Sequence, residues 1–308
     1  MAETTKYLFD APRFHDPEVA RKHLESIRWP NGPVCPHCGT VENQYKLEGK
    51  AHRPGLYECG HCHEQYTVTV GTVFERSKIS LDKWLFAAAL MASSKKGISS
   101  KQIERMLGVT YKTAWFMTHR LREAMKPTDD SPLGGPGKTV EADETFVGGK
   151  AKNRAFRKPA PKKMVVTLVE RDGRARSFHI ANIHAATIRG ALVTHVDRAS
   201  RLMSDDARVY KAVGREFAGG HFPVIHGRRE YAFMDMHSNT AENFFSIFKR
   251  GVIGTYHHLS EVHLHRYCAE FDFRYNTKDI SDRERADLSL KAIGGKRLTY
   301  RRTDKLAA

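Results

Sequence analysis

Several features that mark other protein classes are absent from this sequence of 308 residues. No apolar run approaches the roughly 20 residues that a membrane-spanning helix needs. The opening residues, MAETTKYLFD, lack the basic start and the apolar block of a secretory signal. A glycine-rich nucleotide loop and a nucleophile elbow are also missing, which argues against the small-molecule enzymes built around them. We therefore expect neither a membrane partner nor a small-molecule substrate.

Acidic residues are scarce relative to basic ones. The chain has 35 Asp and Glu against 51 Lys and Arg, which gives a formal net charge of +16. A surplus of this size exceeds what solubility requires and indicates a polyanionic partner such as double-stranded DNA. We therefore expect a cytoplasmic protein that associates with the nucleoid.

Cysteine is also scarce, and four of the five cysteines form two C-x-x-C pairs, CPHC and CGHC. A reducing compartment disfavours disulfides, and two such turns can direct four thiolates at one zinc ion. We therefore predict a structural zinc ribbon within residues 12–78. Its expected ligands are Cys35, Cys38, Cys59 and Cys62. The nearby histidines His37, His61 and His63 are expected to face solvent, with a mixed ligand set as the alternative, and Cys268 to be a small buried hydrophobe.

Residues 79–126 are expected to be helical and to contain a helix-turn-helix DNA-binding domain. Ser99 and Thr110 are placed to cap two successive helices, and Gly108 permits the turn between them. The side chains expected to be available for a DNA groove and its phosphates are Tyr111, Lys112, Thr113, Arg120 and Arg122. The alternative is an ordinary helical hairpin with a solvated basic face.

The tract PTDDSPLGGPG is rich in turn formers and predicts a linker at 127–138. Beyond it, an α/β pattern predicts a catalytic domain at 139–280 and a basic C-terminal tail at 281–308. The expected strands are 139–147, 163–170, 176–181 and 201–205, and the expected helices are 186–197, 240–252 and 260–275.

Three stretches of this α/β region carry acids in similar settings. VEADETFVGGK places Glu141 and Asp143 on one face of a strand, and RLMSDDARVY ends a short apolar strand at Asp205. In HSNTAENFFSIFKRG, Glu242 and Lys249 lie on one polar helical stripe. Each acid alone has a bland explanation as a cap or as a partner of a lysine. Together they supply the hard oxygen ligands that magnesium requires, beside a basic surface for DNA.

The order of these motifs resembles bacterial insertion-sequence transposases of the zinc-ribbon DDE type. The resemblance runs from about residue 15 to residue 278 and includes GTVFERSKISLDKWLFA, LGVTYKTAWFMTHRLREAM and EFDFRYN besides the acidic stretches. It implies an RNase H-like catalytic domain, a mixed sheet flanked by helices whose first and fourth strands carry aspartates. It also implies metal-dependent cleavage at the ends of a DNA element, strand transfer to target DNA, and a homo-oligomer on DNA.

The resemblance assigns roles residue by residue. Asp143, Asp205 and Glu242 match the three acids that bind Mg²⁺ or Mn²⁺, and Lys249 matches the basic residue seven positions after the glutamate. Asp206 remains the alternative to Asp205, although a hydroxyl residue followed by Asp, as in Ser204-Asp205, fits the family pattern better.

Two other functions compete with this interpretation. A non-catalytic DNA-binding regulator would use the ribbon and the helix-turn-helix and leave the acids unexplained. A structure-specific nuclease would cut DNA without joining it. The basic stretch 148–163 is expected to contact DNA or to be a solvated charge run, and His237, Tyr256 and His257 are expected either to reach substrate or to serve the structure.

Overall fold

The computed structural model describes residues 7–148, 161–205, 207–224 and 237–299. The chain divides into two compact units. Unit 1 combines Met1–Lys126 with Asp279–Ala308, and unit 2 is the continuous segment Pro127–Lys278. The two ends of the chain therefore build one unit, and the α/β region is inserted between them in the sequence.

The cysteines of unit 1 lie on and around a small antiparallel sheet. Its strands are β1 (Gln44–Leu47), β2 (Leu56–Cys59) and β3 (Gln65–Tyr66), in the order β1-β2-β3. Trp29 packs edge-on against Tyr57 and Tyr66, with ring centroids 5.4 and 5.8 Å away. This aromatic cluster is the apolar support of a sheet that is too small to form a core of its own.

Helices make up the rest of the described part of unit 1. They are η1 (Leu8–Asp10), η2 (Pro12–Phe14), α1 (Pro17–Arg28), α2 (Leu81–Ser93), α3 (Ser100–Leu107), α4 (Tyr111–Ala124) and α9 (Asp282–Lys291). Helix α2 is apolar on nearly all sides, which makes it the central helix of the unit. Ser99 accepts a hydrogen bond from the Gln102 amide, Gly108 is left-handed at φ 60°, and Thr110 accepts from the Thr113 amide. The expected start and stop signals of α3 and α4 are thus confirmed.

The expectation of a basic tail from residue 281 is wrong for α9. Ser281 and Glu284 form a capping box at its start, and Ala286 and Leu290 are buried. Beyond the helix, the Ile293 carbonyl accepts a hydrogen bond from the Val73 amide at 3.2 Å. The sequence did not predict that α9 is part of unit 1. The helix has few apolar residues, and it packs against α1 and α2, which are distant in sequence.

Unit 2 is built on a five-stranded mixed sheet in the order β6-β5-β4-β7-β8. Strands β6, β5 and β4 run antiparallel, whereas β4 pairs with β7, and β7 with β8, in parallel. The strands are β4 (Thr139–Val147), β5 (Lys163–Glu170), β6 (Ala175–Ile180), β7 (Arg201–Asp205) and β8 (His221–Val224). The sequence did not predict β8, which is short and contains a proline.

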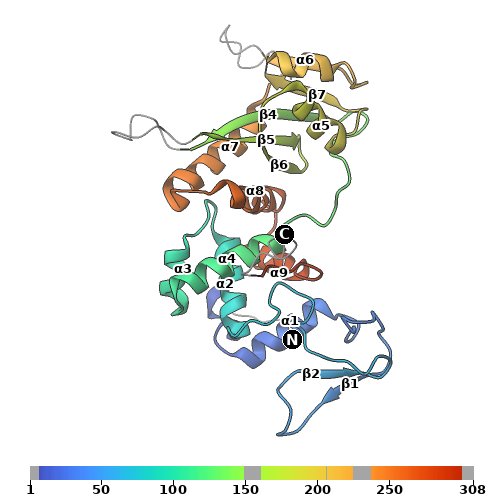
Figure 1. Ribbon diagram of the computed structural model, residues 1–308, viewed down its shortest axis with the longest axis vertical. Coiled ribbons are helices and arrows are strands. Elements are labelled where there is room, and N and C mark those ends of the chain that lie inside the picture. The colour runs from blue at the N-terminus through green and yellow to red at the C-terminus, as the bar shows by residue number, and fades with distance from the viewer. Residues whose placement is uncertain (1–6, 149–160, 206, 225–236, 300–308) are drawn as a thin grey trace, which may run out of the picture. The chain divides into compact units, whose positions relative to one another are not determined.

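Helices cover both faces of this sheet (Figure 1). On one face, α5 (Ala185–His195) and α6 (Arg208–Gly214) pack against Val140, Ala142 and Leu168. On the other, α7 (Asn239–Gly251) and α8 (Glu261–Asn276) pack phenylalanines against Val165 and Val169. The short helix α6 was not predicted. Because β4 is central, most of its side chains are buried; of its acids, Glu141 is fully buried, while Asp143 and Glu144 are half-buried.

Helix α8 also closes the outer edge of β6. Asp272 accepts hydrogen bonds from the amide and hydroxyl of Ser177 at 2.8 and 2.6 Å, and the Asn276 side chain accepts from the Ala175 amide at 2.7 Å. Burial raises the pKa of Asp272 to about 7. Two side chains of the EFDFRYN stretch thus occupy edge amides that would otherwise be open to another strand.

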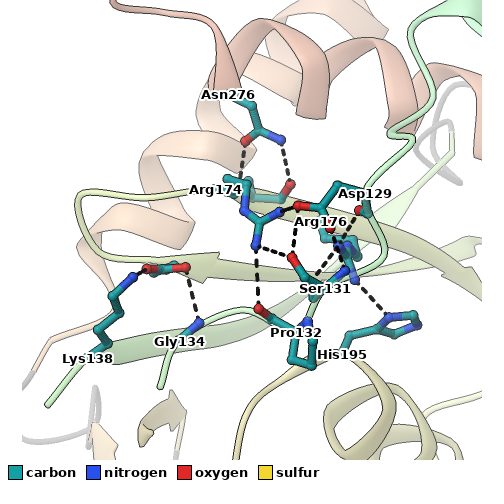
Figure 2. Close-up of polar contacts among 11 residues, drawn as sticks. Asp129, Ser131, Pro132, Gly134, Lys138, Arg174, Arg176, His195 and Asn276 are labelled. Carbon is teal, nitrogen blue, oxygen red and sulfur yellow. Dashed lines mark hydrogen bonds and ion pairs between the residues drawn. The ribbon is translucent and has the colours of Figure 1, made fainter. Parts of the chain in front are cut away.

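The predicted linker at 127–138 is fixed to unit 2 rather than free (Figure 2). Leu133 is fully buried, and its amide donates to the His195 carbonyl at 2.8 Å. Arg174 pairs with Asp129, and Arg176 donates to the Ser131 carbonyl at 3.1 Å. The tract is therefore packed onto the α/β unit as part of it.

Candidate functional site

The four predicted zinc ligands lie together. Their sulfur atoms all fall within 4.8 Å of one another, with Cys35 and Cys62 at 3.7 Å and Cys38 and Cys59 at 3.6 Å. A tetrahedron with zinc–sulfur bonds of about 2.3 Å requires sulfur separations of about 3.8 Å. The cluster therefore fits zinc, which supports the prediction of a structural ion.

Each cysteine pair sits on a tight turn that points backbone amides at sulfur. The amides of Cys62 and His61 lower the pKa of Cys59 to about 6, which favours the thiolate that a metal needs. The turns end at the left-handed residues Gly39 and His63. The side chains of His37, His61 and His63 are exposed, as expected, and Cys268 is buried in the core of unit 2.

Two of the predicted acids come from neighbouring parallel strands. Ala142 of β4 lies opposite Ser204 of β7, so the next residues, Asp143 and Asp205, reach the same level of the sheet. Asp205 ends β7 and accepts a hydrogen bond from the Ala207 amide, just before α6, at 3.1 Å.

The third acid and the predicted base lie on α7. Glu242 and Lys249 are both exposed, while Ala241, Phe245 and Phe248 turn into the core. This is the polar stripe that the sequence predicted.

The electrostatics of Asp143 bring all four groups into one neighbourhood. Burial is the main cause that raises the pKa of Asp143 to about 6; the charges of Asp205 and Glu242 add to it, and the Glu144 amide and the Lys249 ammonium oppose it. Asp143 therefore lies within electrostatic range of two carboxylates and one ammonium from distant parts of the chain.

The acids are less tightly gathered than the cysteines. Within the described ranges, the cysteines form the one set of three or more metal-ligating side chains whose donor atoms all lie within 4.8 Å, and the acids do not form such a set. Besides burial, the nearby charges of Asp205 and Glu242 contribute to the raised pKa of Asp143, and a bound divalent cation would relieve that repulsion. The oxygen donors therefore suit Mg²⁺ or Mn²⁺ in chemistry, and binding one ion by all three would require the side chains to move closer together.

Two further acids of the VEADETFVGGK stretch have different roles, which sequence reasoning did not separate. Glu141 is fully buried and paired with Arg171 at 2.7 Å, so it is not open to a cation. Glu144 accepts a hydrogen bond from the buried Tyr210, and burial raises its pKa to about 6. Alternation along the strand could have placed Glu144 on the opposite face from Asp143, but nothing in the sequence identifies its tyrosine partner.

Other expected contact residues have structural partners. His237 lies against Glu141 and Arg171, and the Tyr256 hydroxyl donates to Glu270 at 2.7 Å. His257 is exposed. Asp206 and most of the basic stretch 148–163 lie outside the described residues.

The expected DNA-contact set on α4 divides in two. Tyr111 and Lys112 are exposed and Thr113 is half-buried at the start of the helix. The expectation that Arg120 and Arg122 are available to phosphates is wrong, because both are buried. Arg120 donates to two backbone carbonyls, and Arg122 donates to the Thr118 hydroxyl at 3.1 Å. Arg120 and Arg122 are expected on the surface because they are charged. The sequence does not show which groups accept their hydrogen bonds.

Comparison with known proteins finds two matching domain families. An ISXO2-like transposase domain matches residues 132–276, and a transposase zinc-ribbon domain matches residues 15–65. The chain therefore combines a region similar to ISXO2-like transposase domains with a region similar to transposase zinc ribbons. It is also 29% identical over 270 residues to an uncharacterized protein in transposable element ISH50 of Halobacterium salinarum, a match that covers 82% of this chain and 88% of that protein.

The two matched regions contain both candidate cation sites. The acids and Lys249 fall in the transposase domain and the cysteines in the zinc ribbon, whereas α3 and α4 lie between the two matches. No helix in the described part of the chain is long and apolar enough to span a membrane.

Proposed function

We propose that this chain is the active transposase of an insertion sequence, which binds the ends of its element and catalyses metal-dependent cleavage and strand transfer. The observation that carries the proposal is that Asp143 and Asp205 lie at the same level of neighbouring strands, with Glu242 and Lys249 near enough for their charges to act on Asp143. The matched transposase domain supplies the reaction class. Because its substrate would be chromosomal DNA, we expect the protein to act in the cytoplasm, at the nucleoid.

The fold of unit 2 supports this assignment. With its strands counted in chain order, the sheet runs 3-2-1-4-5, with the first three antiparallel and the last pairs parallel, and helices on both faces. This is the arrangement expected of an RNase H-like domain. The first and fourth strands carry Asp143 and Asp205, as the family resemblance requires.

Asp143, Asp205 and Glu242 would hold the divalent cations, which when bound supply charge neutralisation and an activated oxygen nucleophile at the scissile phosphate. The protein's own part is positional. Strands β4 and β7 fix two carboxylates at one level of a rigid sheet, and α7 presents the third. Lys249, two turns from Glu242 on the exposed stripe, is placed to hold a DNA phosphate.

DNA binding is assigned to unit 1 and to the basic surface. Helices α3 and α4, joined at Gly108, are proposed to act as a helix-turn-helix, with Tyr111, Lys112 and Thr113 at the start of the second helix facing the groove. The zinc ribbon is proposed as a structural module beside it. A homo-oligomer on DNA is part of the proposal, since two element ends must be processed together.

The test is a cleavage and joining assay with DNA that carries the element's ends. Wild-type protein with Mg²⁺ is expected to nick at the end and to join the released 3′-hydroxyl to target DNA. Asp143→Asn should lower the cleavage rate by about 10³-fold or more, a loss of about 4 kcal/mol of transition-state stabilisation, with a cation-free melting temperature no lower than that of the wild type. Cleavage without joining would favour a nuclease. Binding without cleavage by the wild-type protein would favour a DNA-binding regulator, and full activity of Asp143→Asn would refute the site assignment.

A further inference from the structure

The buried carboxylate of Glu141, two residues before Asp143 on the same strand, contacts the start of α7. Glu141 has no exposed surface, and it accepts hydrogen bonds from the amides of Thr240 and Ala241 at 2.9 and 3.0 Å. The Thr240 hydroxyl donates to it as well, at 3.0 Å. Because the first amides of a helix have no partners within the helix, a carboxylate at this position fixes both the position and the direction of α7.

Arg171, which follows β5, extends the same contact set to a third element. Its guanidinium donates to Glu141 at 2.7 Å, to the His237 carbonyl at 2.8 Å and to the Met203 sulfur at 2.9 Å. Its own amide donates to the Thr139 carbonyl at the start of β4 at 3.0 Å. One side chain therefore contacts β4, β7 and the segment that leads into α7.

These contacts fall next to each proposed acid. Glu141 is two residues before Asp143, Met203 is two residues before Asp205, and Ala241 directly precedes Glu242. We propose that Glu141 and Arg171 are positioning residues that set the three acid-bearing elements at the spacing needed for a divalent cation, an inference that rests on the proposed function. The Glu141–Arg171 pair itself binds neither cation nor DNA.

The physical argument is that such a pair is a poor way to gain stability alone. Removing two charges from water costs about as much as their attraction returns, and an apolar pair of similar size often serves equally well. A neutral serine or threonine also caps a helix effectively. What the charged pair adds is precise positioning. Besides contacting each other, Glu141 and Arg171 make five hydrogen bonds to β7, to the start of α7 and to the segment before it. Neighbours that orient metal ligands in this way typically change metal affinity by about 10- to 100-fold when altered.

The test measures Mn²⁺ binding to the full-length protein by electron paramagnetic resonance, alongside thermal unfolding. Glu141→Gln keeps an acceptor for the α7 amides and removes the charge. It is expected to weaken Mn²⁺ binding by about tenfold or more. The double variant Glu141→Gln with Arg171→Met removes both charges. Glu141→Gln alone leaves the Arg171 charge unpaired and should lower the melting temperature. The double variant is expected to regain most of that loss but not the Mn²⁺ affinity.

A matched control exists in the same unit. Glu270 is also fully buried and pairs with Arg274 at 2.6 Å, within α8. Glu270→Gln should lower thermal stability and leave Mn²⁺ affinity within twofold of wild type. If Glu141→Gln or the double variant folds and binds Mn²⁺ as the wild type does, the positioning role is overturned.

The same experiment separates this inference from the proposed function. Asp143→Asn should abolish the Mn²⁺ signal of the acidic site. If wild type and Asp143→Asn bind Mn²⁺ equally, the proposed function fails and the inference fails with it. If Asp143→Asn loses the site while both charge-removal variants keep it, the inference alone is wrong.

Discussion

The two candidate cation sites of this chain are built in opposite ways. The zinc ligands come from two short turns, and the most distant pair in contact, Cys35 and Cys62, is 27 residues apart in sequence. The acidic site is assembled from two strands and a helix, and the contact that ties them joins Glu141 to Ala241 across 100 residues. The sulfur atoms meet within 4.8 Å, whereas the three carboxylates do not. In the zinc site, local turns fix the positions of the ligands. In the acidic site, the packing of distant elements fixes them.

The strongest way to break this comparison is to remove the zinc. Structural zinc sites contribute about 10 kcal/mol or more to the folding of their modules, so a zinc-selective chelator should unfold the ribbon and leave the acidic site intact. Four thiols should become reactive to a thiol reagent, while the buried Cys268 stays protected. Reaction of Cys268 at the same rate as the other four would show that the two units do not unfold independently.

A smaller effect tests how unit 1 is closed. Leu290 of α9 is buried, so Leu290→Ala should cost about 3 kcal/mol of unfolding free energy in unit 1. Leu288 on the same helix is 40% exposed, and Leu288→Ala should change stability by less than about 0.5 kcal/mol. Denaturant unfolding of the two variants makes the comparison. Equal, small losses in the two variants would mean that residues 282–291 do not stabilise unit 1.

The pH dependence distinguishes the acidic site from the ribbon. The folded-state pKa of Asp143 lies near 6, above the ordinary 3.8. A raised acid pKa favours the protonated form, so cation-free stability should fall as pH rises from about 4 through 6, while cation affinity should grow up to about tenfold per unit over the same window. The expected result is a larger increase in melting temperature on adding Mg²⁺ at pH 7 than at pH 5. Asp143→Asn should abolish that difference, and its persistence would assign the effect to another group.

The smallest effect concerns the helix proposed to enter the DNA groove. Lys112→Ala should weaken binding to all DNA sequences alike and reduce the slope of log affinity against log salt by about one. Filter binding at several salt concentrations measures this slope. An unchanged slope would mean that Lys112 contacts no phosphate.

How far the sequence could predict each site follows from the same contrast. The cysteine spacing identified the ribbon, and the periodicity of α7 placed Glu242 and Lys249 on one exposed stripe, because both patterns are local. Burial of Arg120 could not be predicted, since its carbonyl partners lie at residues 75 and 298.

The sheet shows the same division between local and long-range information. Strands with alternating or continuous apolar residues were predicted, whereas the four-residue β8 and the seven-residue α6 were not. The partner of Glu141 was also invisible, because neither alternation nor charge says that an arginine after the next strand folds back onto it. Residues whose role depends on long-range contacts were therefore the ones that were missed or misassigned.

The most direct test of the central claim is to map which parts of the chain lie beside a bound cation. Fe²⁺ with ascorbate and peroxide cuts the polypeptide next to the site that it occupies. The account predicts cuts near residues 143, 205 and 242 together, all suppressed by excess Mg²⁺ and all lost in Asp143→Asn. Cuts at one of these places alone, or cuts that Mg²⁺ does not suppress, would contradict a shared site.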